Sequence, residues 1–198
     1  MRICRGKLVW SLALLALGAA QARAEGDYAR SGAYLGLAQS LAVDHFSNTG
    51  GFSYDPSYGV NTRVGYRGHP HFSVELEGEW LSGFDGSIPG GGDFDLEAWA
   101  ITTNLKVYPW TGRLQPFLLA GVGIMEAQAK PRPANPDFGV GTDASDEERD
   151  LATRFGAGVE YYLTEHFVLA AHLTYLVPFG GLDDFVYLSI GWGAQYRF

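Results

Sequence analysis

The stretch Val74-Glu-Leu-Glu-Gly-Glu-Trp80 alternates carboxylates with apolar or small residues. In an extended strand, successive side chains point to opposite faces of the sheet. Glu75, Glu77 and Glu79 would therefore share one face, where like charges repel each other unless cations lie among them. The apolar residues would share the other face. The stretch thus predicts a strand that separates an apolar medium from a polar space holding charges of both signs.

The same alternation recurs in eight segments of the chain. They span residues 33–43, 58–67, 72–80, 98–107, 117–124, 152–162, 167–175 and 186–198. Most exceed the usual strand length of about 5–6 residues and approach the ~9–11 residues of a tilted membrane-spanning strand. Both faces of 117–124 are apolar, and we assign Leu118 and Val122 to its outward side. Short connectors (67–71, 108–115, 163–166) alternate with mostly longer ones (44–57, 83–95, 127–149).

The apolar faces of these segments carry no Lys, Arg, Asp or Glu, which would cost about 2–4 kcal/mol at the middle of a bilayer. Aromatic residues gather at the segment ends in two groups. The short-connector group is Tyr66, Phe72, Trp110, Tyr161, Phe167, Tyr196 and Phe198, and the long-connector group is Tyr58, Trp80, Trp99 and Tyr175. Two aromatic belts around an apolar band indicate a membrane barrel. The alternative is a secreted soluble β-sandwich, which would bury its apolar faces in a core.

A candidate export signal begins the chain. Three basic residues precede an apolar run over 8–20 that only Ser11 interrupts, and Ala22-Arg23-Ala24 supplies a small-x-small cleavage pattern. We predict a cleaved secretory signal peptide over 1–24, export through the Sec pathway, and one barrel domain over 25–198.

Cysteine content and charge exclude several kinds of site. The only cysteine, Cys4, lies in the predicted signal peptide, so the mature chain would have no thiol for a disulfide, a metal or a nucleophile. Cleavage removes four of the 14 basic residues and none of the 22 acidic ones, which leaves a net charge of −12. This charge argues against nucleic-acid binding.

The polar faces of the segments carry charges of both signs. They are Arg63, Arg67, Glu75, Glu77, Glu79, Lys106, Arg154, Glu160, His172 and Arg197. Side chains fill the interior of an eight-stranded barrel, and buried charges must be paired. We therefore expect a salt-bridge network that closes the lumen, with Arg63 opposite Glu77 and with Arg67 or Arg63 near Glu75. A narrow channel for small solutes is the alternative.

Several motifs together are similar to the OmpA-like family of small outer-membrane β-barrels. They are GAYLGLAQSLAV (from Gly32), TNLKVYP (from Thr103), PFLLAGVGI (from Pro116), RFGAGVEYYL (from Arg154) and the terminal GWGAQYRF. The resemblance implies an all-β fold, namely an eight-stranded antiparallel up-and-down transmembrane barrel with short periplasmic turns and longer extracellular loops. It also implies a C-terminal insertion signal for the barrel-assembly machinery and periplasmic chaperones, formed by Ile190, Trp192, Tyr196 and Phe198.

The resemblance implies a role in the outer membrane as a structural or surface-interaction protein, in adhesion, immune evasion or membrane integrity. Its neighbours would be membrane lipids and lipopolysaccharide, and a host or surface ligand would bind the extracellular loops, including 127–149. We expect a monomer without a cofactor. A second alternative is an enzyme, because His45-x-Ser47-Asn48 resembles the His-x-Ser-Asn motif of lipid A deacylases, where His would activate Ser. That motif falls late in the family's barrel and early here.

Acidic residues gather in two of the longer connectors. They are Asp85, Asp93 and Asp95 in the first, and Asp143, Asp146, Glu147 and Glu148 in the second. Such oxygen ligands suit Ca²⁺, but their spacing matches no known calcium loop. We expect solvated outer segments that contact the divalent cations bridging lipopolysaccharide.

Overall fold

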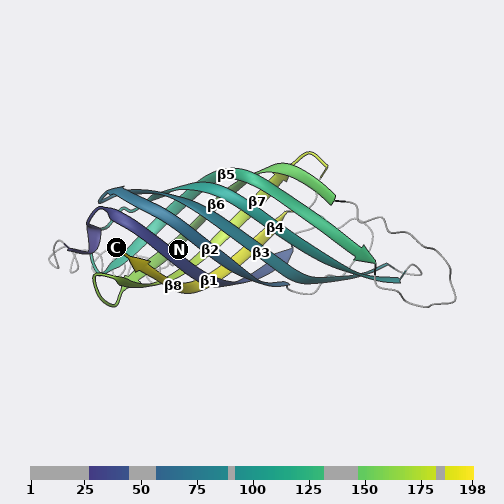
Figure 1. The fold of residues 1–198 in the computed structure, drawn as a ribbon, viewed down its shortest axis with the longest axis horizontal. Coiled ribbons are helices and arrows are strands. Elements are labelled where there is room, and N and C mark those ends of the chain that lie inside the picture. Colours follow the sequence, from purple (N-terminus) through teal and green to yellow (C-terminus); the bar gives the residue numbers. More distant parts are fainter. Residues whose placement is uncertain (1–26, 45–56, 89–91, 132–146, 182–185) are drawn as a thin grey trace, which may run out of the picture.

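The structure, a computed structural model, describes residues 27–44, 57–88, 92–131, 147–181 and 186–198. It forms one closed barrel in which each strand pairs antiparallel with the next and β1 pairs with β8 (Figure 1). A short 3-10 helix, η1 (Asp27–Ala29), precedes the strands. These are β1 (Gly32–Asp44), β2 (Ser57–His69), β3 (Phe72–Ile88), β4 (Gly92–Val107), β5 (Leu114–Pro131), β6 (Glu147–Tyr162), β7 (Phe167–Phe179) and β8 (Tyr187–Arg197). The predicted eight-stranded antiparallel barrel is confirmed.

The predicted signal peptide, residues 1–24, lies outside the described residues. In the part of the chain that the structure describes, no helix combines the length and the apolarity needed to cross a membrane.

The two ends of the barrel differ. At one end, short turns join β2 to β3, β4 to β5 and β6 to β7, and the C-terminus lies beside them (Figure 1). The amide of Phe198 donates to the carbonyl of Ala33 over 3.0 Å, so the last residue completes the ring there. At the other end, β3, β4 and β5 project past the remaining strands (Figure 1). We call these the short-turn end and the long-hairpin end.

The predicted loops 83–95 and 127–149 are too long, because strand pairing continues through most of them. Pairing between β3 and β4 extends to Ile88 opposite Gly92, and pairing between β5 and β6 extends to Gln128 opposite Glu147. An irregularity between Ser82 and Phe84 marks where β3 leaves its pairing with β2. The ends of β3–β6 thus pair with one another beyond the closed ring, at the long-hairpin end. We call these paired ends, residues 84–88, 92–96, 125–131 and 147–150, the extension.

The alternation of the sequence is reproduced in the burial of the side chains. Along β2 and β7, buried and exposed residues take turns almost without interruption. In β5, Leu118 and Val122 point outward while Phe117 and Leu119 are buried in the interior, so the orientation assigned to this strand is confirmed. Of the aromatic residues in the two predicted belts, only Trp99 is half-buried, and all the others are exposed. Tyr161, Tyr175 and Tyr196 have the smallest exposed fractions among the exposed ones.

Candidate functional site: the charged barrel interior

The ten charged or titratable residues of the predicted network all point into the barrel. Each has at most 5% of its surface exposed, and they come from six of the eight strands, β2, β3, β4, β6, β7 and β8. The carboxylates of the opening stretch therefore face the enclosed space, and the cations that their repulsion requires are in the same space.

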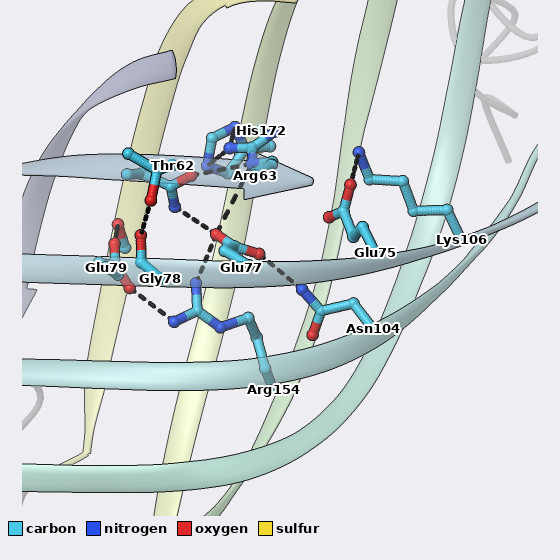
Figure 2. Close-up of polar contacts among 12 residues, drawn as sticks. Thr62, Arg63, Glu75, Glu77, Gly78, Glu79, Asn104, Lys106, Arg154 and His172 are labelled. Carbon is cyan, nitrogen blue, oxygen red and sulfur yellow. Dashed lines mark hydrogen bonds and ion pairs between the residues drawn. The ribbon is translucent and has the colours of Figure 1, made fainter. Parts of the chain in front are cut away.

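Arg154 of β6 joins two carboxylates of β3 (Figure 2). Its Nη1 lies 2.8 Å from Oε1 of Glu77, and its Nη2 lies 2.7 Å from Oε2 of Glu79. Asn104 donates to Glu77 over 2.6 Å, and Asn61 donates to the other oxygen of that carboxylate. A forked guanidinium with neutral amide donors around it supplies the hydrogen bonds that a buried carboxylate needs.

Glu79 is held from a third strand as well. Tyr187 and Ser189 of β8 donate to its two oxygens over 3.0 and 2.8 Å. In a closed ring of eight, β3 lies three strands from β6 and three from β8. These contacts therefore cross the interior of the barrel.

Arg63 lies opposite Glu77 in the strand register, as predicted. The distance from its Nε to Oε1 of Glu77 is 3.8 Å, which is longer than the contact made by Arg154. Its Nε donates to Asn61 over 2.9 Å, and its Nη2 lies 2.7 Å from Nε2 of His172 on β7. The nearest cation to Glu77 is therefore supplied across the lumen and not by the adjacent strand.

Lys106 forms the second centre of the network. Its Nζ lies 2.7 Å from Glu75 and 3.3 Å from Glu160, and 4.5 Å from the ring centre of Phe117 (Figure 2 shows the pair with Glu75). Tyr34 donates to Glu75 over 2.9 Å. The expected partners of Glu75, Arg67 or Arg63, are thus replaced by Lys106, which comes from the neighbouring strand on the other side.

Arg67 and Arg197 lie at the short-turn end. Arg67 donates to Gln115 over 2.6 Å and to the hydroxyl of Tyr162 over 3.1 Å, and Arg197 donates to the same hydroxyl. Since β2 and β6 are four positions apart in a ring of eight, the contact between Arg67 and Tyr162 spans the full width of the barrel.

Neutral hydrogen-bonding residues were missed as members of this site. They are Tyr34, Asn61, Asn104, Tyr108, Gln115, Tyr162, Tyr187 and Ser189. Several of them occupy the same alternate positions along their strands as the inward-facing charged residues. This alternation is the sequence feature by which they could have been identified.

Two glycines make room for the network. A Cβ on Gly65 would lie 2.2 Å from Cζ of Tyr34, and one on Gly191 would lie 2.1 Å from Cε1 of His172. Both ring side chains occupy the space that the missing Cβ leaves.

The described side chains leave little free space beside Arg63. A cavity beside Gly36, Arg63 and Gln195 has a volume of about 10 Å³, which is close to the minimum for one water molecule. Among the described residues, no group of His, Cys, Asp or Glu has a metal-binding arrangement. His45 and Ser47 lie outside the described residues, as do Asp143 and Asp146.

The residues of the predicted insertion signal lie on the outward side of β8 and at Phe198, which directly follows it. Ile190, Trp192, Tyr196 and Phe198 are all exposed there. The ring of Tyr196 contacts those of Phe167 and Phe198, with centroids 5.2 and 5.1 Å apart.

Comparisons with known proteins agree with this architecture. The chain is similar to Ail, the attachment invasion locus protein of Yersinia pestis, at 20% identity and a TM-score of 0.53, over 85% of this chain and 97% of that one. Neisserial surface protein A matches at 15% identity and a TM-score of 0.63, over 85% and 98%. OprG of Pseudomonas aeruginosa matches at 17% identity and a TM-score of 0.57, over 88% and 99%. These likenesses show the fold.

No curated protein sequence matches the chain significantly. The profile of a family described as "Outer membrane protein beta-barrel domain" matches residues 10–198, nearly the whole chain. The chain therefore belongs to the outer membrane protein beta-barrel domain family.

Proposed function

We propose that this protein is a non-conducting, monomeric outer-membrane barrel with a structural and surface-interaction role. The observation that carries the proposal is the set of contacts that cross the lumen, from Arg154 to Glu77 and Glu79 and from Arg67 to Tyr162. An ion that passed through would have to displace several charge-assisted hydrogen bonds in succession. The short-turn end would face the periplasm after Sec-dependent export, with lipid and lipopolysaccharide around the wall.

The extension supports a role at the cell surface. Residues 84–88 of β3 pair with β4 alone, and residues 147–149 of β6 pair with β5 alone, among the residues that the structure describes. Such edges present unpaired backbone donors and acceptors to which an extended segment of another protein can bind. The extension therefore suits adhesion or immune evasion better than transport.

The charge of the chain narrows the kind of partner. One structure of Ail holds sucrose octasulfate, a heparin analogue. Without the predicted signal peptide the chain has a formal net charge of −12, and Asp85, Asp93 and Asp95 lie on the extended parts of β3 and β4. We therefore expect a neutral or cationic protein partner in place of a sulfated polysaccharide.

Planar-bilayer recordings of the refolded chain test the closed lumen. We expect no steady, discrete openings from the wild type, and a leak from an Arg63→Ala/Arg154→Ala variant that still shifts mobility on heating in gel electrophoresis. Steady openings of the wild type would favour the alternative of a narrow channel for small solutes.

Whole-cell assays test the surface role. Replacement of residues 84–95 by an Asn-Gly turn should reduce adhesion or serum survival while the barrel still folds, and shortening of 128–147 tests the second hairpin. Unchanged behaviour of both variants would restrict the role to membrane integrity.

Catalysis stays the less supported reading. The only evidence for a lipid A deacylase is the four-residue match at His45 and Ser47. Release of fatty acid from lipid A by the wild type and not by Ser47→Ala would establish it.

A further inference from the structure

The segment that leads into β1 turns under the barrel and does not simply approach its first strand. Residue 31 needs only to reach Gly32 at the rim, yet η1 folds inward and buries Ala29. The ring of Tyr28 packs against that of Tyr162, with centroids 5.4 Å apart. Figure 1 shows η1 at the short-turn end, beside the C-terminus. The segment thus lies against interior residues of the barrel at this end.

The backbone of this segment supplies hydrogen-bond acceptors to the interior. The carbonyl of Tyr28 accepts from Nε2 of Gln115 over 3.2 Å and from Nη1 of Arg197 over 3.4 Å. The carbonyl of Arg30 accepts from Nη2 of Arg197 over 3.1 Å. A guanidinium group that is removed from water must have its hydrogen bonds replaced by protein acceptors. These two carbonyls supply some of the acceptors for Arg197.

The same few residues reach the short turns around the rim. Ser31 donates to the carbonyl of Gly68, at the turn between β2 and β3, over 3.3 Å. Nη1 of Arg30 lies 3.7 Å from Glu165, in the turn between β6 and β7. With the contact to Gln115 at the start of β5, four consecutive residues bridge three turns and the last strand.

We propose that residues 28–31 act as a clasp that seals the short-turn mouth of the barrel. The salt-bridge network closes the middle of the lumen, and the clasp separates Arg67, Arg197 and Tyr162 from water at its end. Removal of the clasp would wet this layer and leave the network around Arg154 closed.

Thiol labelling distinguishes a local seal from a general contribution to folding. Ser73→Cys places a near-isosteric reporter at the level of Arg67, its register partner. Ser40→Cys places a second buried reporter on β1 towards the long-hairpin end, at a hydroxyl without a hydrogen-bond partner among the described residues. Each reporter is built into the chain from residue 25, which has no other cysteine. A membrane-impermeant maleimide is applied to the refolded barrel in detergent, with and without residues 27–30, which comprise η1 and all of the clasp except Ser31.

Deletion of 27–30 should accelerate labelling at position 73 at least tenfold and leave position 40 unchanged. Tyr28→Ala/Arg30→Ala, which keeps the chain length, should give a smaller increase in the same direction. An unchanged rate at position 73 in a folded deletion variant would overturn the proposal, as would equal acceleration at both positions. If the deletion variant does not fold, the double substitution decides between these outcomes.

Discussion

At the scale of single residues, the interior depends on matched partners more than on the presence of charge. Glu77 accepts hydrogen bonds from Arg154, Asn104 and Asn61, so both of its carboxylate oxygens have protein donors. Removal of one member of a buried pair leaves the other charge without compensation. The cost of a substitution in the interior is therefore set mainly by the buried charge that loses its partner.

We predict that Glu77→Gln lowers the free energy of unfolding by about 3–5 kcal/mol, since it removes one of the two carboxylates that contact Arg154 and the carboxylate nearest to Arg63, while both guanidinium groups stay buried. Urea unfolding of the refolded barrel in lipid vesicles measures the loss. Glu165→Gln is the matched control, because Glu165 is half exposed and its ion pair with Arg30 is long. A loss of similar size in both variants would mean that burial of the pair is not the cause.

A second prediction concerns space in the interior. Gly65→Ala should destabilise the barrel by about 1–3 kcal/mol, because the new methyl group collides with the ring of Tyr34. Gly78→Ala is the control on the outward face, where the new Cβ would meet only Oγ1 of Thr62 at 3.4 Å. Equal unfolding midpoints for the two variants would contradict the packing argument.

The partners of individual residues were only partly predictable from the sequence. Neighbouring strands align by register, so Arg63 could be placed opposite Glu77. The contact of Arg154 with Glu77 joins strands that are three apart, and it depends on the tilt and stagger of the closed sheet. Alternation along single strands contains no information on that stagger.

At the scale of the strand, an alternating pattern persists only where one face contacts an apolar medium. The eight strands and their orientation were predictable for this reason. In the extension, β3 continues as Phe84-Asp-Gly-Ser-Ile88 and β4 begins with Gly92-Asp-Phe-Asp95, with little apolar alternation. These segments lie beyond the apolar band, so strand pairing continues there without the pattern that identified it elsewhere.

The outward face of the strands gives a third prediction. Leu76→Arg, on the outward face near the middle of the part of β3 that pairs with β2 (residues 72–82), should lower stability in lipid by about 2–4 kcal/mol. Leu163→Arg, in the turn after β6, should change it by about 0–1 kcal/mol because it lies near the interface. Unfolding in vesicles compared with detergent micelles checks the difference, and an equal cost at both depths would contradict the placement of the apolar band.

At the scale of the whole molecule, the end of the chain has two separable features: its backbone closes the barrel by pairing with β1, and its outward aromatic residues form the predicted insertion signal. Phe198 lies on the outward face, while its backbone pairs with β1. We predict that Phe198→Ala reduces the amount of folded barrel in the outer membrane of living cells several-fold and leaves the unfolding midpoint of the refolded protein almost unchanged. Phe72→Ala, another exposed aromatic residue at the short-turn end, should leave the cellular amount unchanged. A comparable loss for both variants would remove the special role of the C-terminal residue.

Closure of β1 on β8 also brings Gly32 and Phe198 together, since a Cβ on Gly32 would lie 2.8 Å from the carbonyl oxygen of Phe198. A short peptide linker could therefore join the C-terminus to the N-terminal end of β1. New termini could then be introduced in the connection between β1 and β2. Such a circular permutant would keep every strand neighbour of the ring while ending on a different strand. The stability of the permutant after refolding in vitro would report on closure of the barrel. The amount of folded permutant in the outer membrane of cells would report on recognition of the last strand during assembly.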